Sequence, residues 1–342
     1  TPERVNMSIL GNPITLGGGG LELVANVETG ATVTAKLGSK TVTGVSVDGQ
    51  ARLKIPQEGK WTVSATSGAL VSAPQEIIVP ATVDIALVRQ DLNDNSWAAI
   101  KQVSNANMGA NFWSVGDCKE VTMNGKVSNG LTLTNYSAWV FIIGFNHNSE
   151  REGNGIAFQG FKATKNGTPV CLVDSRYNNQ CSSVWFCMNA SSASGSTTSA
   201  GGWESCGMRK DIMPLIKAAF PSDLQTVIKT ITIYTDNTGN GIGGVAPTAT
   251  QDDVFLLAEY EVFGTRTHAS TQEPNYLKQY SYYSAGNSKV KYRHNATDTE
   301  VRWWERSPAA SYSNSFCTVT ANGSANYYNA SISQGVSPAF KV

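Results

Sequence analysis

The sequence predicts two domains, an all-β sandwich at residues 1–90 followed by a larger α+β domain at 91–342. Three observations lead to this prediction. Up to about residue 90, short β-rich runs alternate with turn residues, whereas the rest combines strands, short helices and long loops. The polar stretch 91–95 separates the two patterns. The chain has 342 residues, 41% of them hydrophobic, which is enough for a core in each domain.

Charge and hydropathy exclude two classes of partner. Lys plus Arg and Asp plus Glu are both 26, and only 15% of residues are charged, so a basic face for nucleic acid is not expected. The longest dense apolar stretch, 138–145, has the length of a strand and is too short to span a membrane. We therefore predict no nucleic-acid partner and no membrane span.

The first domain begins after a glycine run at 17–20. Seven β-rich runs follow, at 21–27, 32–37, 41–45, 51–55, 60–65, 76–79 and 83–88. Leu53 and Ile55 alternate before the turn 56–59, and Trp61 and Val63 alternate after it, which predicts a hairpin with one apolar face. Nothing in this domain indicates catalysis.

The second domain opens with a short helix and a buried strand. Ser96 is placed to cap a helix in which Trp97, Ile100 and Val103 fall on one side. The continuous apolar run at 139–147 predicts a central strand that is covered on both faces.

The clearest helix is expected at 212–219, capped by Asp211 and ended by Pro221. A capping box at 222–225 predicts one more helical turn. The remaining expected elements are strands at 231–235 and 254–262, a small-residue loop at 190–202 and a Gly- and Thr-rich loop at 236–253.

The last stretch, 303–340, has two apolar ends and a polar middle. Trp303, Trp304 and Pro308 begin it, and the segment 335–340 ends it. The middle has no Lys or Asp and is rich in Ser, Asn, Tyr, Ala and Gly, a composition shared with antibody loops, where Tyr supplies rigid contact area. We expect a buried frame at 303–308 and 335–340 around a contact surface at 311–330. The simpler alternative is a polar loop.

The pattern of this middle segment does not let all four of its aromatic residues point inward, so they are the expected anchors of a contact. Alternatively, their rings pack back onto their own domain. Tyr280, Tyr282 and Tyr283 are further candidates for the edge of the same surface. The predicted ligand-binding residues are Ser311, Tyr312, Ser313, Asn314, Phe316, Asn322, Ser324, Asn326, Tyr327, Tyr328 and Asn329.

Other residues offer weaker signals for chemistry. Glu259 and Glu261 would share one face of a strand, as glycosidase carboxylates can, but pairing with Arg209 or with backbone donors is favoured. The histidines, His147, His268 and His294, have no carboxylate at metal-ligand spacing. The sequence Glu273-Pro274-Asn275 matches a calcium-lectin tripeptide whose companion Trp-Asn-Asp is missing. We predict no catalytic residues, no metal and no cofactor.

The six cysteines show no zinc-type spacing. Buried free thiols are slightly favoured, and a bridge between Cys181 and Cys187 or between Cys171 and Cys206 is the alternative.

Both domains resemble known families. Residues 1–90 resemble small immunoglobulin-like modules, related to carboxypeptidase-regulatory and PEGA-type domains, which act as spacers or attachment modules in phage tail and bacterial surface proteins. From about Ser96 the chain resembles phage and prophage tail-associated domains with a C-type-lectin-like fold. The matching segments are 112–117, 142–147, 203–209, 254–262, 303–308 and 335–340.

The resemblance extends to the variable proteins of diversity-generating retroelements, in which a C-terminal surface is mutated between fixed borders. It implies a non-enzymatic receptor-binding protein of a phage or prophage tail, or a retroelement-diversified variable protein. The implied partner is a protein or glycan on a bacterial or host cell surface, with a homotrimer as a possible assembly. The alternatives are a bacterial surface adhesin and a structural tail component without a binding site.

Two residues depart from the family pattern. Glu305 stands where the family commonly has a hydrophobic residue, and Ser337 stands where it has an Arg. The related formylglycine-generating oxidases use a cysteine pair and a metal, whereas Cys317 has no second cysteine nearby in the sequence.

Overall fold

The protein is described here by a computed structural model, which covers residues 20–192 and 194–342. Residues 1–19 of the predicted domain 1–90, including most of its glycine run, and Ala193 in the predicted loop 190–202 lie outside the described residues. The chain is mostly β, with 40% of residues in strands and 16% in helices. The described chain forms two compact units that divide after Leu87. The sequence pattern places the boundary three residues later.

The first unit is a β-sandwich built from eight strands. One sheet has the order β4-β1-β8, and the other has the order β3-β2-β5-β6 with β7 also paired to β5. Inward-facing residues of both sheets, such as Leu23, Val33, Leu53 and Trp61, form one shared core. The strands are β1 (Leu21–Asn26), β2 (Thr32–Leu37), β3 (Lys40–Val45), β4 (Gln50–Ile55), β5 (Gly59–Ser67), β6 (Leu70–Val71), β7 (Gln75–Val79) and β8 (Ala81–Asp84).

The predicted hairpin in this unit is wrong. β4 pairs with β1 and β5 pairs with β2, so the turn 56–59 crosses from one sheet to the other. Leu53 and Trp61 are both buried and face the same core from opposite sheets. Alternation shows that each strand has an apolar face, but it does not show which strand is its neighbour.

The second unit is organised around a five-stranded antiparallel sheet of order β15-β21-β11-β10-β9. Smaller sheets have the orders β12-β16-β17, β13-β14 and β18-β19-β20. The strands are β9 (Cys118–Ser128), β10 (Leu131–Phe145), β11 (Ile156–Lys162), β12 (Val170–Cys171), β13 (Ile231–Thr235), β14 (Thr248–Asp252), β15 (Val254–Phe255), β16 (Lys291–Arg293), β17 (Ala296–Val301), β18 (Trp303–Pro308), β19 (Ser315–Val319), β20 (Ala325–Asn329) and β21 (Ala339–Lys341).

The helices of this unit are short. They are α1 (Trp97–Asn105), α2 (Gly109–Phe112), α3 (Ser149–Glu152), α4 (Gly202–Ser205), α5 (Met213–Ala219), α6 (Ser222–Gln225), α7 (Glu259–Phe263) and α8 (Ser281–Ser284), with single turns η1 (Leu92–Asp94), η2 (Met208–Ile212) and η3 (Glu273–Asn275). The Ser96 cap is confirmed, because its hydroxyl accepts the Ala99 N–H at 3.1 Å. No described helix has the length and apolarity that a membrane crossing requires.

Three expectations about these elements are wrong. Asp211 lies inside η2 and does not cap α5, and no side chain caps α6, so the capping box at 222–225 is absent. The expected strand 254–262 is the two-residue β15 followed by α7, because the segment turns into a helix at Glu259.

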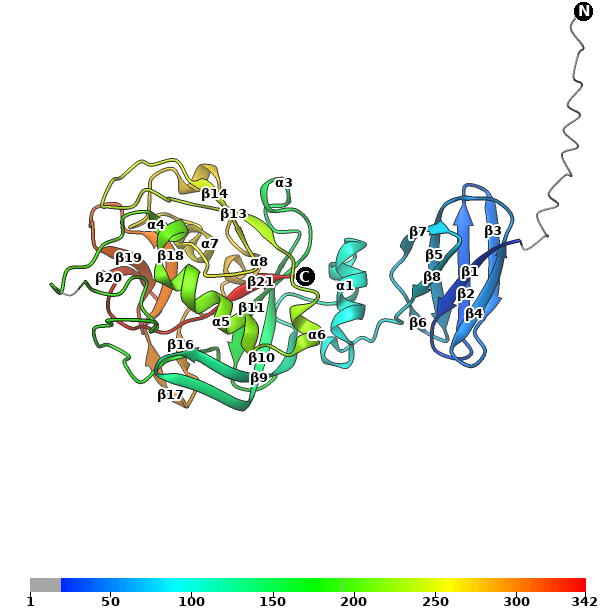
Figure 1. Cartoon of the computed structure of the whole chain (residues 1–342), viewed down its shortest axis with the longest axis horizontal. Coiled ribbons are helices and arrows are strands. Elements are labelled where there is room, and N and C mark those ends of the chain that lie inside the picture. Colours follow the sequence, from blue (N-terminus) through cyan, green and yellow to red (C-terminus); the bar gives the residue numbers. More distant parts are fainter. Residues whose placement is uncertain (1–19, 193) are drawn as a thin grey trace, which may run out of the picture. The chain divides into compact units, whose positions relative to one another are not determined.

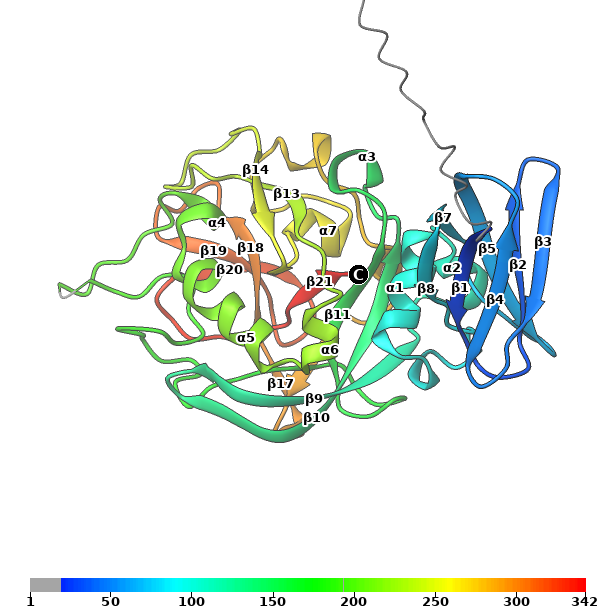
Figure 2. The same ribbon diagram turned by 45° about the vertical axis from the view of Figure 1, so that its right-hand side comes forward.

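The C-terminal strand β21 lies inside the large sheet, between β15 and β11 (Figure 1). Its Phe340 stacks on Phe158 with ring centroids 5.4 Å apart and also meets the rings of Trp97 and Phe220. Strand β10 carries the buried run predicted at 139–147, and Phe141, Ile142 and Ile143 are fully buried. The sheet β18-β19-β20 lies at the end of this unit away from α1, as Figures 1 and 2 both show.

Candidate binding surface at the C-terminal strands

The predicted frame is buried. Trp303 and Trp304 have no exposed surface, and their indole N–H groups donate to the carbonyls of Lys289 at 3.0 Å and Phe186 at 2.9 Å. Val336 and Phe340 are also fully buried. The two ends of the stretch therefore fix the sheet β18-β19-β20 to the core of the second unit.

The predicted contact residues have different degrees of exposure. Phe316 is fully buried, so its predicted place on the contact surface is wrong. It lies on β19, the central strand of its sheet, whose residues are all buried. Tyr280, Tyr282 and Tyr283 are also buried and cannot border the surface. Exposed are Ser311, Tyr312, Ser313, Asn322, Ser324 and Tyr328, and half-buried are Asn314, Asn326, Tyr327 and Asn329.

Tyr327 and Tyr328 point to opposite faces of the edge strand β20, because successive side chains of a strand alternate. Tyr328 is opposite Phe316 and Tyr327 is opposite Cys317 in the ladder with β19. The predicted surface therefore consists of two faces that share one edge strand.

The first face is a cluster of stacked rings. Tyr327 stacks on Tyr312 with centroids 4.1 Å apart and meets His268 edge-on at 5.1 Å. Tyr312 remains 45% exposed, because the stacking covers only one side of its ring. This pair presents a rigid aromatic surface to solvent.

Two loops far away in sequence support this face. Ser199 donates its N–H to the Ser313 carbonyl at 2.7 Å. Gly241, at φ +71°, lies so close to the chain that an added Cβ would be 2.9 Å from the Ser313 nitrogen, so only glycine allows this approach. Ile242 follows it and is 48% exposed. These loops were expected from their Ser- and Gly-rich composition, but nothing in the sequence signalled that they meet at 312–313.

The second face joins Tyr328 to arginine. The Arg302 guanidinium lies 4.7 Å from the Tyr328 ring centre and donates to Thr318 Oγ1 at 3.1 Å. The Arg302 backbone N–H donates to the hydroxyl of Tyr177 at 2.9 Å, and Arg293 lies over the Tyr177 ring at 5.5 Å. Sequence reasoning missed Arg302, Tyr177 and Arg293, which lie outside the polar segment.

The backbone edge of β20 is partly blocked. The backbone N–H of Thr320 donates to the Ser324 carbonyl, and that of Ala330 donates to the Asn314 carbonyl. Hydrogen-bonded residues alternate along an antiparallel strand, so the even-numbered residues of β20 bond to β19 and the backbone of Tyr327 faces the free edge. The Asn326 side chain accepts the Tyr327 N–H at 2.8 Å. Since a free edge is a template for another strand, this contact disfavours recognition by strand addition and leaves recognition to side chains.

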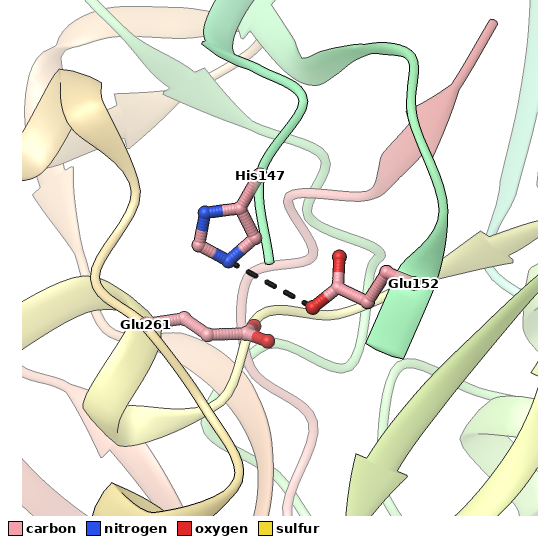
Figure 3. A group of neighbouring side chains, drawn as sticks. All are labelled: His147, Glu152 and Glu261. Atoms are coloured by element: carbon pink, nitrogen blue, oxygen red, sulfur yellow. Dashed lines mark ion pairs between the residues drawn. The ribbon is translucent and has the colours of Figure 1, made fainter. Parts of the chain in front are cut away.

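A second cluster, deep in the unit, contains His147, Glu152 and Glu261 (Figure 3). One ligand atom from each lies within 4.8 Å of the others, and all three side chains are buried. His147 has no carboxylate at metal-ligand spacing in the sequence, but the fold brings one close to it, since its Nε2 lies 3.8 Å from Glu152 Oε1. Burial holds the pKa of His147 well below its usual range.

The chain's own cations pair with the carboxylates of this cluster. Arg306 donates to both oxygens of Glu261 at 2.5 and 2.7 Å, and Lys341 donates to Glu152 Oε2 at 3.0 Å. Burial raises the pKa of Glu152 to about 7, against the opposing effect of Lys341. Because two chain cations already neutralise the carboxylates, we assign the cluster to holding β18 and β21 in place.

The neighbouring acidic groups have structural partners as well. Glu259 accepts the N–H groups of Thr267, His268 and Ala269 at 2.8–3.0 Å. Glu259 and Glu261 lie on helix α7, not on a strand, and Arg209 pairs with Asp252 instead of either. Glu273 of the lectin-like tripeptide is fully buried and accepts the Ser307 hydroxyl, and burial raises its pKa to about 8.

The two departures from the family pattern lie in the frame. Glu305 is fully buried, and neither of its oxygens has a hydrogen-bond partner among the described residues. Burial, followed by nearby Glu259, raises the pKa of Glu305 well above the usual range. Ser337 is buried and donates its hydroxyl to the Gly160 carbonyl.

All six cysteines are free and buried, so neither bridge considered from the sequence is formed. The thiols of Cys181 and Cys187 do lie within hydrogen-bonding reach of each other, and this contact, with burial, raises the pKa of Cys187. Burial also raises the pKa of Cys317 well above its usual range, which keeps it as an unreactive thiol.

Comparison with known proteins identifies a family for the second unit. Residues 171–342, half of the chain, match the domain of unknown function DUF6273, and the chain belongs to that family. The match includes β18, β19, β20 and β21 and therefore the whole candidate surface. No curated protein and no solved structure matches the chain.

Proposed function

We propose that this chain is a non-enzymatic binding protein whose C-terminal surface contacts a protein or glycan on a cell surface. In this proposal the first unit is an immunoglobulin-like spacer, and the second has a C-type-lectin-like α+β fold with a diversifiable segment at 311–330. The setting we favour is the receptor-binding protein of a phage or prophage tail, or a retroelement-diversified variable protein. A structural tail component and a bacterial adhesin are the alternatives.

One observation carries the proposal. Tyr312, before β19, and Tyr327 and Tyr328, on the edge strand β20, are exposed or half-buried, while the frame segments 303–308 and 335–340 are largely buried. A Tyr exposes a large, rigid area whose burial on contact supplies much of the energy of an interface. A frame that fixes the backbone lowers the entropy lost on binding, because the rings are already held in place by stacking.

The buried acidic groups support a non-enzymatic role. Glu259 and Glu261 accept hydrogen bonds from backbone and from Arg306, and they are enclosed in the interior. These carboxylates therefore accept hydrogen bonds that stabilise the fold and are not accessible to a ligand. The tyrosine surface is accessible to one.

The test is a binding assay with the full chain, fluorescently labelled, on a panel of bacterial cells and immobilised glycans. The variant Tyr312→Ala/Tyr327→Ala/Tyr328→Ala should lose binding at least tenfold. Its melting temperature should fall by only a few degrees, since none of the three rings is fully buried. The control is Tyr276→Ala, a half-buried Tyr that lies against Arg151 elsewhere in the unit.

Unchanged binding by the triple variant, or a collapse of its fold, would refute the role of the tyrosines. The diversification part has its own test at DNA level, in which close homologues are compared. Adenine-linked differences confined to Ser311–Ala330 would support a displayed variable surface, and evenly spread differences would favour the structural tail component.

A further inference from the structure

The arginine beside Tyr328 on its face of β20, Arg302, has no acidic partner in the part of the chain that the structure describes. Arg176, Arg293 and Arg302 form no ion pair with any described residue, whereas Arg209 and Arg306 pair with Asp252 and Glu261. The three guanidiniums lie instead over aromatic rings, those of Trp185, Tyr177 and Tyr328. The positive charge of Arg302 beside Tyr328 is therefore not compensated by an ion pair.

The donors of these arginines are only partly used. The Arg302 guanidinium donates one N–H to Thr318 Oγ1, and the Arg293 Nε is buried with no hydrogen-bond partner among the described residues. A guanidinium carries five N–H donors in one plane, and stacking on a ring occupies its face and leaves the edge free. The free edges are suited to two-point binding of an oxyanion such as a carboxylate.

The four groups form a continuous row. Arg293 lies over Tyr177, the Tyr177 hydroxyl accepts from the Arg302 backbone, and Arg302 lies over Tyr328. Tyr328 ends the row and is 37% exposed. Asp174, three residues before Tyr177, is buried and accepts the Phe186 N–H and the Ser333 hydroxyl, whereas Glu300, two residues before Arg302, is exposed to solvent.

We propose that this row, Arg293, Tyr177, Arg302 and Tyr328, binds a carboxylate-bearing saccharide. The Arg302 guanidinium takes the carboxylate, and the exposed part of the Tyr328 ring packs on the sugar. This inference rests on the proposed binding function and adds the charge class of the ligand. A saccharide fits better than an acidic protein because the row combines a ring face with planar donors and the half-buried amide of Asn326.

The probes are oligosaccharides that contain galacturonate, glucuronate or sialic acid, each paired with its methyl ester. Esterification removes the charge and keeps the sugar, so it isolates the contribution of the carboxylate. Titration calorimetry of the full chain should show the acids binding at least tenfold more tightly than their esters, with affinity that falls as salt is raised.

The variant Arg302→Gln should weaken binding of the acids at least tenfold and leave binding of any ester unchanged. Its matched control is Arg151→Gln, because Arg151 also lies over tyrosine rings, those of Tyr234 and Tyr276, away from β20. The melting temperature of Arg302→Gln should stay within a few degrees of that of the parent, and Arg302→Lys should recover only part of the affinity.

The outcomes separate the two proposals. Equal binding of acids and esters would overturn the carboxylate inference and leave the binding function standing. Binding of an acidic polypeptide such as polyglutamate, and of no saccharide, would also overturn it by assigning the row to a protein partner. No binding to any glycan or any cell in the panel would count against the proposed function itself.

Discussion

Replacing Arg306 with Met should destabilise the second unit in a way that depends on pH. Arg306 is fully buried and donates to both oxygens of Glu261, to Thr235 Oγ1 and to the carbonyls of Leu256 and Tyr234. Methionine fills similar space but supplies none of these donors. The variant leaves a buried carboxylate without its cation.

The loss of unfolding free energy depends on whether the stranded carboxylate stays ionised or takes up a proton. Removing one member of a buried ion pair costs about 3–5 kcal/mol, and the lost carbonyl contacts bring the total to about 4–6 kcal/mol at pH 7. The stranded carboxylate can instead take up a proton. At pH 7 that costs about 3.7 kcal/mol for an ordinary glutamate, which ionises near pH 4.3, and at pH 5 it costs about 1 kcal/mol. The loss should therefore be about 2–3 kcal/mol smaller at pH 5.

The sign follows from proton binding. The folded variant keeps a proton that its unfolded chain releases above about pH 4.3, so its stability relative to the parent falls as pH rises. Calorimetry of the full chain should show the transition of the second unit about 10–20 °C lower at pH 7. The transition of the first unit, which lacks this substitution, is the internal reference.

The double variant Arg306→Met/Glu261→Gln is the control. Because it removes the stranded charge, the double variant should recover most of the pH-dependent loss of stability. Its stability relative to the parent should then be the same at pH 5 and pH 7. An equal loss at both pH values, or no recovery in the double variant, would show that the pair is not the source of the stability.

Two further changes test the frame. Trp304→Ala should cost about 3–5 kcal/mol, because the indole is fully buried and donates to the Phe186 carbonyl; chemical denaturation checks this, and unchanged stability would contradict the assignment. Glu305→Leu should stabilise the second unit by about 1–3 kcal/mol, because it removes a buried carboxyl that has no partner. The raised pKa of Glu305 means that the parent loses stability as pH rises above about 4.3, so the gain should be larger at pH 8 than at pH 5. Glu305→Gln should show the same pH dependence, because it also removes the ionisable carboxyl, but not the stabilisation that comes from removing a buried polar group. A Leu variant that is less stable than the parent would contradict this prediction.

Local signals in the sequence identified the elements that depend on neighbouring residues. The strands of the first unit, the helix begun by Ser96 and the buried ends of the stretch 303–340 all follow from periodicity, capping and apolar runs. The hairpin around 56–59 failed because alternation also fits a turn that changes sheets. The same limit explains Phe316, whose neighbours are polar in sequence but whose strand lies between two others.

The sequence by itself determined that the last forty residues contain a buried frame around a polar and aromatic segment, because two tryptophans and several other apolar residues lie at the ends and the residues between them are rich in Ser and Asn. Only the tertiary structure decided which groups meet there. It placed Tyr327 and Tyr328 on opposite faces of β20, brought Arg302 and Tyr177 beside Tyr328, and joined His147 to Lys341 across 194 residues. These contacts depend on strand order and chain crossings, which arise from packing of the whole unit and leave no local pattern.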